Sequence, residues 1–148
     1  MDIGVYCVEA MVGLFGRPKQ VVAVPVFLKD GIDGAGTIVA EYDAMVVELV
    51  YSKITKSHAK TEIQGEDGIM LIPEIVNPGE IEIIYNTGEV EKVGTSLMEG
   101  NMVFEVAYFI QAIKEKAFPK KYREITEISM EILDEARKQM GVVFPADE

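Results

Sequence analysis

The chain has 148 residues, of which 49% are hydrophobic and 26% are charged, and its formal net charge at pH 7 is −11. That length favours a single domain with a sizeable hydrophobic core. The negative charge argues against proteins that bind nucleic acids or anionic membrane surfaces, because both partners are bound through clusters of Lys and Arg.

The first predicted element is a helix over Ile3–Phe15, where apolar residues recur with helical spacing. Asp2 is placed to accept hydrogen bonds from the free amide groups of the first turn. Gly16 and then Pro18 predict its end. Because the helix is apolar on most of its surface, we expect it to be buried between layers.

The middle of the chain favours strands. Six short segments are rich in β-branched residues and separated by turn residues: Val21–Leu28, Ala44–Tyr51, Ile54–Ala59, Ile69–Ile72, Ile81–Tyr85 and Val90–Val93. Short connections require neighbouring strands to run antiparallel. In the first two segments both alternating sets of side chains are largely apolar, so both sheet faces should be covered, one by helices and the other by a partner subunit.

Two amphipathic helices are predicted after the strands, over Asn101–Lys116 and Tyr122–Met140, each with an apolar stripe typical of a helix on a core. The element order predicts an α+β fold with a mostly antiparallel open sheet of about six strands, helices on one face, and the other face used for association. No Gly-x-Gly-x-x-Gly motif joins a strand to a helix, so a dinucleotide-binding domain is not expected in this chain.

Three single features favour structural roles. Cys7 is expected to be a small buried hydrophobe, and His58 a solvated or hydrogen-bonded strand residue, so no metal site is predicted. Gly31–Gly36 resembles a phosphate-binding loop, but it precedes an extended segment rather than a helix, which favours a flexible connection between strands. One cysteine, no signal peptide and no apolar run of about 18 residues favour the cytoplasm.

Asp2 and Tyr6 are one helical turn apart, so both side chains could project into a cleft at the start of the first helix. A phenol acts as an acid or base near neutral pH only where its anion is stabilised, for example by a helix amino terminus or an ammonium group. The alternative is that Asp2 caps the helix and Tyr6 belongs to the core. The residues alone leave both interpretations open.

An ordered set of segments resembles the second domain of the Gfo/Idh/MocA oxidoreductases and covers nearly the whole chain. The segments are Asp2–Tyr6, Leu14–Lys19, Ile63–Met70, Phe104–Ile113 and Leu133–Pro145. The resemblance implies that residues 1–148 are the carboxy-terminal substrate and oligomerisation domain of a longer enzyme. An upstream Rossmann domain, absent from this chain, would bind NAD or NADP, and this fragment alone would bind no cofactor and be inactive.

The resemblance also implies roles for two residues. Tyr6, at a position where many members carry His, would exchange a proton with a hydroxyl of a sugar, cyclitol or diol, and Asp2 would orient that hydroxyl or the phenol. A lysine on the missing half would stabilise the Tyr6 anion. The expected partners are a second copy of the chain, bound through the sheet face, and the Rossmann domain in cis. A non-catalytic oligomerisation module, or a small-ligand-binding module, is the alternative.

Overall fold

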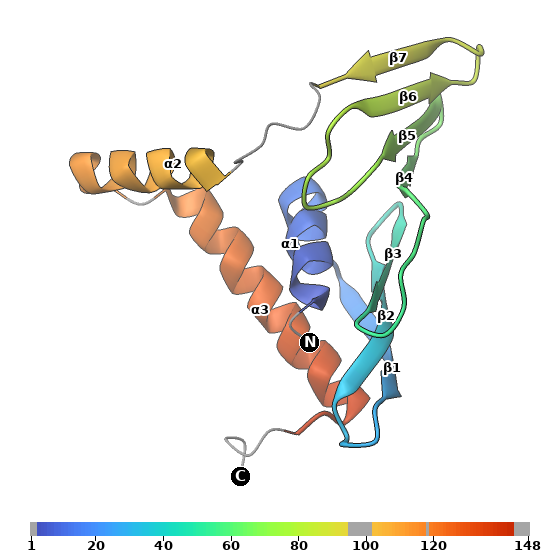
Figure 1. The fold of residues 1–148 in the computed structure, drawn as a ribbon, viewed down its shortest axis with the longest axis vertical. Coiled ribbons are helices and arrows are strands. Elements are labelled where there is room, and N and C mark those ends of the chain that lie inside the picture. Colours follow the sequence, from blue (N-terminus) through green and yellow to red (C-terminus); the bar gives the residue numbers. More distant parts are fainter. Residues whose placement is uncertain (1–2, 95–101, 118, 144–148) are drawn as a thin grey trace. The chain divides into compact units, whose positions relative to one another are not determined.

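The computed structural model describes residues 3–94, 102–117 and 119–143, which divide into two compact units. Unit 1 combines Met1–Lys56 with Pro119–Glu148, and unit 2 is Ser57–Phe118. Unit 2 is therefore inserted in the sequence between two segments that fold together (Figure 1). Each unit is described by itself.

Unit 1 is a three-stranded sheet with two helices on one face. Its elements are α1 (Gly4–Phe15), β1 (Gln20–Phe27), β2 (Asp33–Glu41), β3 (Val46–Ser52) and α3 (Lys120–Met140). The strands are antiparallel and in the order β1-β2-β3. Helix α1 packs against α3 and β3, and α3 also packs against β1 (Figure 1).

The core of unit 1 lies between the sheet and its helices. The buried apolar side chains of the sheet are Val21, Ala23, Ile38, Ala40 and Tyr51; those of the helices are Val8, Met11, Val12, Ile132, Leu133, Ala136 and Met140. Along each strand these buried side chains alternate with a second set, which points to the opposite face of the sheet and stays exposed. We call this second set the open sheet face, and its valines are Val22, Val24, Val26, Val39, Val46 and Val50.

Polar contacts fix α3 along the edge of the sheet. The Gln139 side chain accepts a hydrogen bond from the Ala23 amide at 3.0 Å and donates one to the Val21 carbonyl at 2.9 Å. These groups belong to β1, which is an edge strand, so Gln139 satisfies backbone atoms that no neighbouring strand reaches. Gly141 then ends α3 in the left-handed conformation, with φ of 71°.

Unit 2 contains a four-stranded antiparallel sheet and one helix. The strands β4 (Thr61–Gln64), β5 (Gly68–Ile72), β6 (Ile81–Tyr85) and β7 (Val90–Val93) pair in chain order. The tight hairpin expected at residues 86–88 is confirmed, since the Tyr85 amide donates to the Glu89 carbonyl at 2.9 Å. The helix α2 (Met102–Glu115) follows.

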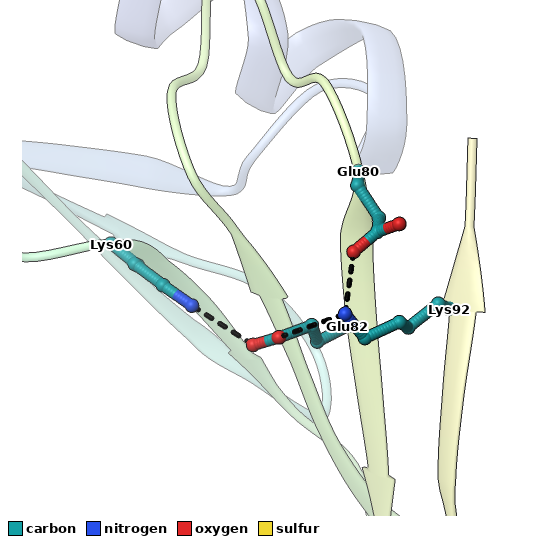
Figure 2. Close-up of polar contacts among 4 residues, drawn as sticks. All are labelled: Lys60, Glu80, Glu82 and Lys92. Atoms are coloured by element: carbon teal, nitrogen blue, oxygen red, sulfur yellow. Dashed lines mark hydrogen bonds and ion pairs between the residues drawn. The ribbon is translucent and has the colours of Figure 1, made fainter. Parts of the chain in front are cut away.

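Four charged side chains connect the strands of unit 2 (Figure 2). Lys60, just before β4, reaches Glu82 on β6 at 2.9 Å, and Lys92 on β7 lies 2.7 Å from Glu80 and 4.0 Å from Glu82. The hydrogen bond and charge of Lys60, with a further contribution from Lys92, lower the pKa of the Glu82 carboxyl. Glu82 therefore holds together two segments of the sheet that are not adjacent strands.

The α+β class, the antiparallel pairing and the helices on one face of the sheet in unit 1 are confirmed. The strands form two sheets, however, rather than the single sheet of about six strands that the sequence predicts. The predicted strand over Ile54–Ala59 is wrong: the Ser52 hydroxyl accepts hydrogen bonds from the Ile54 and Thr55 amides, and the extended pairing resumes only at Thr61. A side-chain turn of this kind competes with strand pairing.

The interpretation of Gly31–Gly36 as a connection between strands holds for Gly31 and Ile32 but is wrong from Asp33 onward. The turn ends at Ile32, whose carbonyl accepts a hydrogen bond from the Leu28 amide at 2.8 Å, and β2 begins at Asp33. Gly34 and Gly36 are glycines inside a strand because neighbouring side chains fill the space beside them.

Helices α1 and α2 bury fewer side chains than the sequence predicts. Helix α1 buries one side only, since Tyr6 and Leu14 are more than half exposed. Helix α2 buries none of its side chains, although its apolar stripe was expected on a core. No described residue of unit 2 covers that stripe, which includes Val103, Val106, Ile110 and Ile113.

Candidate functional site

The first turn of α1 carries the residue predicted to move a proton. Tyr6 is 53% exposed, so its interpretation as a core aromatic is wrong. Gly4, two residues earlier, is buried and faces the ring of Tyr51 on β3. Asp2 lies outside the described residues, so its pairing with Tyr6 stays a prediction. The helix thus presents the Tyr6 phenol on its outer side, where a ligand from another part of a protein can reach it.

A buried polar cluster lies beneath that turn, formed by Asp33, Tyr51 and Lys53. The Asp33 side chain has no exposed surface, and its Oδ1 is 3.5 Å from Nζ of Lys53. Burial, followed by the charge of Asp33, raises the pKa of the Tyr51 phenol. The cluster therefore pairs a buried carboxylate with a partly exposed ammonium, next to a buried phenol.

Tyr51 contacts three elements of unit 1 at once. A Cβ added to Gly36 on β2 would lie 2.6 Å from the Tyr51 hydroxyl oxygen, and one added to Gly4 on α1 would lie 3.4 Å from Cδ1 of the ring. The hydroxyl is also 3.6 Å from Sδ of Met140 in the last turn of α3. Because the ring is only 3% exposed, it fills the space between the sheet and the start of α1.

A second tyrosine holds the other end of α1. The Tyr42 hydroxyl donates a hydrogen bond to the Gly16 carbonyl at 2.8 Å, and its ring meets Phe15 edge-on, with centroids 6.2 Å apart. Burial raises the pKa of this phenol too. Helix α1 is therefore fixed at both ends by phenols that come from the sheet side of unit 1.

Sequence reasoning missed the buried cluster. Asp33 lies in a glycine-rich stretch typical of a loop, and Tyr51 ends a segment that reads as an ordinary strand. Only the β2–β3 register, which sets Gly36 opposite Tyr51, brings them together. The available signal was the pair of glycines inside an extended segment, because glycines in a strand often mark a close approach of another group.

The remaining candidates do not form a site. Cys7 is half-buried, and its burial raises the pKa of the thiol. His58 is exposed, in a segment that is not a strand. Among the described residues, no three His, Cys, Asp or Glu side chains are grouped so that they could hold a metal ion. No helix within the described ranges is long and apolar enough to cross a membrane.

Two depressions stand out on the surface formed by the described residues, and Tyr6 lines neither of them. One, in unit 2, lies around the β4–β5 turn and includes Ile63, Met70 and Tyr85. The other, in unit 1, lies between Arg17 and Glu131 near the end of α1. Both are open to solvent, so neither has the enclosed shape typical of a small-ligand site.

Similar proteins are oxidoreductases. The chain is 42% identical over its whole length to scyllo-inositol 2-dehydrogenase (NADP(+)) of Bacillus subtilis and covers 46% of that protein. It is 32% identical to the oxidoreductase YgjR of Escherichia coli and 26% identical to mouse trans-1,2-dihydrobenzene-1,2-diol dehydrogenase, covering 45% and 47% of them. The chain thus spans about half the length of the curated relatives that it matches.

The fold is also found in a solved oxidoreductase. A 3-ketoreductase from Actinomadura kijaniata, solved with NADP, matches with a TM-score of 0.81 and 18% identity, over 94% of this chain and 46% of that one. No family model matches the sequence.

Proposed function

Because the chain is homologous to the carboxy-terminal part of Gfo/Idh/MocA-type oxidoreductases, we propose that it is the substrate domain of an NADP-dependent dehydrogenase. The observation that carries the proposal is the 42% identity, over the whole chain, to a protein named scyllo-inositol 2-dehydrogenase (NADP(+)). The missing half of the enzyme would be a Rossmann domain in the same polypeptide. The single cysteine favours a cytoplasmic protein.

We assign nucleotide binding to the missing half and none of it to this chain. The sequence contains no Gly-x-Gly-x-x-Gly motif, the pattern that holds a dinucleotide pyrophosphate at the start of a helix. What this chain offers instead is an exposed phenol on α1. A bound nicotinamide would supply the hydride acceptor, as it does in other dehydrogenases.

In this proposal Tyr6 handles the proton. When a substrate carbinol loses its hydride, its hydroxyl proton must also leave, and the Tyr6 phenolate oxygen accepts it; in the reverse reaction the phenol returns it to the carbonyl oxygen. Asp2, one turn earlier, orients the substrate hydroxyl or the phenol. A lysine of the missing half would stabilise the phenolate.

We infer a ring-shaped polyol as substrate. Two of the relatives are named for ring compounds that carry hydroxyls on adjacent carbons, an inositol and a dihydrobenzene diol. The test is to express the longer polypeptide and follow NADPH formation with scyllo-inositol, myo-inositol and a cyclic trans-diol. We expect turnover of at least one of them with NADP, and none by residues 1–148 alone. If calorimetry shows tight binding of NADP to residues 1–148 alone, the assignment of nucleotide binding to the missing half is wrong.

We further propose that the open sheet face is where two copies of the chain associate. Its six valines are each between 37% and 67% exposed, and they lie side by side on three paired strands. An extended apolar surface of this kind usually marks an interaction site. Closed symmetric dimers bury the same face of both copies, which suits a flat sheet.

A charge at the centre of the open sheet face should separate the copies. Val24 is 63% exposed and its register partner is Thr37, so Val24→Glu leaves the core untouched and adds to the negative charge of Glu41 and Glu48 on the same face. In sedimentation velocity at micromolar concentration we expect a dimer or larger for the unchanged chain and a monomer for the variant. Leu14→Glu, at an equally exposed position on α1, is the control that should still associate. If the unchanged chain, Val24→Glu and Leu14→Glu all sediment with the same mass, the open sheet face is not the surface through which copies associate.

A further inference from the structure

Strand β1 is an edge strand without charge. Among the described residues, the edge strands of the two sheets are β1 and β3 in unit 1 and β4 and β7 in unit 2. Three of them carry charged side chains, which are Glu48 on β3, Glu62 on β4, and Glu91 and Lys92 on β7. Strand β1, by contrast, reads Gln-Val-Val-Ala-Val-Pro-Val-Phe. An uncharged, apolar edge strand is a template with which another chain can pair, so this edge needs a different protection.

A side-chain amide from α3 takes the place of a neighbouring strand on that edge. Oε1 of Gln139 accepts a hydrogen bond from the Ala23 amide at 3.0 Å, and Nε2 donates one to the Val21 carbonyl at 2.9 Å. Nε2 also donates to Oε1 of Glu135, one helical turn earlier, at 2.8 Å, so a second contact orients the amide. Because a glutamine amide offers a donor and an acceptor, as a peptide group does, Gln139 occupies two backbone groups that an incoming strand would need.

Pro25 removes the next hydrogen-bond donor along the same edge. In a strand the backbone groups of every second residue point to the same edge, so those of Pro25 point outward together with those of Val21 and Ala23. Proline has no backbone N–H, and inside sheets it is found where that group would face away from the ladder. Three successive outward positions of β1 therefore each lack a group for pairing: a carbonyl and an amide are occupied, and a third residue has no amide hydrogen.

We propose that Gln139 and Pro25 together keep β1 of one copy from pairing with β1 of a second copy. Two antiparallel copies of the same strand, related by a twofold axis, would join two three-stranded sheets into one sheet. Edge pairing combined with association through another surface would not close after two copies, so it would build open assemblies. The role is independent of the proposed catalytic activity, because neither residue belongs to the site around Tyr6.

The test is a double variant of the 148-residue chain, Pro25→Val with Gln139→Leu. Valine restores a backbone N–H and favours a strand, whereas leucine keeps the bulk of the side chain without its amide. In sedimentation velocity we expect species of about twice the mass of the unchanged chain or more, with a mass that grows with concentration.

The matched control is Pro73→Val with Gln111→Leu. Pro73 is exposed and lies outside the strands, and Gln111 is an exposed glutamine of α2 that bonds Glu115 on its own helix at 2.8 Å. The two changes have the same chemistry but do not touch the edge of β1. The control should sediment as the unchanged chain does, and equal assembly of both double variants would overturn the proposal.

Hydrogen exchange at the Ala23 amide shows whether the new contact is made at the edge of β1. In the unchanged chain Gln139 accepts from this amide, so its exchange should be slow at any protein concentration. In the Pro25→Val, Gln139→Leu variant we expect exchange about tenfold faster in dilute solution, because one hydrogen bond is lost, and slow exchange again in the concentrated, assembled sample. Assembly without this dependence on concentration would place the contact elsewhere and refute the role of the edge.

Two further variants keep the outcome decisive. If the loss of Gln139 unfolds the chain, Pro25→Val alone decides, because it leaves both bonds of Gln139 in place; a folded Pro25→Val chain of unchanged mass would then count against the proposal. Val39→Glu, added to the double variant, places a charge on the open sheet face in the central strand β2. Assembly through the edge of β1 should survive that charge. If it does not, the copies meet through the open sheet face and the proposal fails.

Discussion

Tyr6→Phe is expected to lower the kcat of the longer enzyme by about a hundredfold or more, because general acid–base catalysis contributes at least that much when a single positioned group carries it. Tyr6 is 53% exposed, so losing its hydroxyl should not disturb the core, and unfolding by urea should be unchanged. Substrate KM and NADP binding should also change little, since the lost interaction acts on the proton rather than on binding. The measurement is the steady-state rate of NADPH formation at saturating polyol.

Two variants make this prediction sharper. Tyr6→His restores a proton acceptor and should recover part of the rate, with the acid limb of its pH profile moved to lower pH, because an imidazole has an ordinary pKa of about 6.5 and a phenol of about 10. Tyr122→Phe removes the hydroxyl of another half-exposed tyrosine, on α3, and should keep full activity. A Tyr6→Phe enzyme with near-normal kcat would remove Tyr6 from the mechanism.

Gly36→Ala is expected to destabilise unit 1 strongly. The added methyl would lie 2.6 Å from the Tyr51 hydroxyl oxygen and 2.8 Å from Cζ, distances that real side chains do not adopt. Tyr51 has little room to retreat, because it is buried and its ring also lies against Gly4 on α1. Overpacking a well-packed core costs roughly 1–3 kcal/mol. The urea midpoint of the 148-residue chain, followed by circular dichroism, should fall accordingly.

Gly13→Ala is the matched control, because the same methyl group added to α1 meets nothing within 4 Å. In the middle of a helix alanine is favoured over glycine by about 0.5–1 kcal/mol, so the midpoint should rise. Opposite signs for the two substitutions would show that contact with Tyr51, rather than the loss of glycine, destabilises Gly36→Ala. A midpoint that is unchanged in Gly36→Ala would mean that Tyr51 is not fixed as described.

The sequence predicts the secondary structure of this protein better than it predicts how the strands join. The three helices and the hairpin at residues 86–88 follow from spacing and turn residues, which act over a few positions. The strand β2 was missed because its glycines resemble a loop, and their reason for being there is a side chain on the next strand. The false strand over Ile54–Ala59 had acceptable composition, but the Ser52 hydroxyl turns the chain first.

The candidate site likewise has one part that the sequence predicts and one part that it does not. Tyr6 could be singled out from its place in a short motif at the start of a helix, and its exposure agrees with a functional role. The contact of Tyr51 with Gly36 could not, since these residues are 15 positions apart and come together only through the pairing of β2 with β3. Local patterns indicate where the helix begins, whereas the exposure of its side chains and the residues packed beneath it depend on tertiary packing.

The insertion of unit 2 between β3 and α3 has a consequence for how the molecule is made. Helix α3 supplies Ile132, Leu133, Ala136 and Met140 to the core of unit 1, yet the ribosome completes it only after the whole of unit 2. During synthesis the core side chains of β1, β2 and β3 therefore lack their contacts with α3 until unit 2 has been synthesised. Unit 2 can fold by itself in that interval. We expect newborn chains that stop before residue 120 to be the ones that chaperones retain.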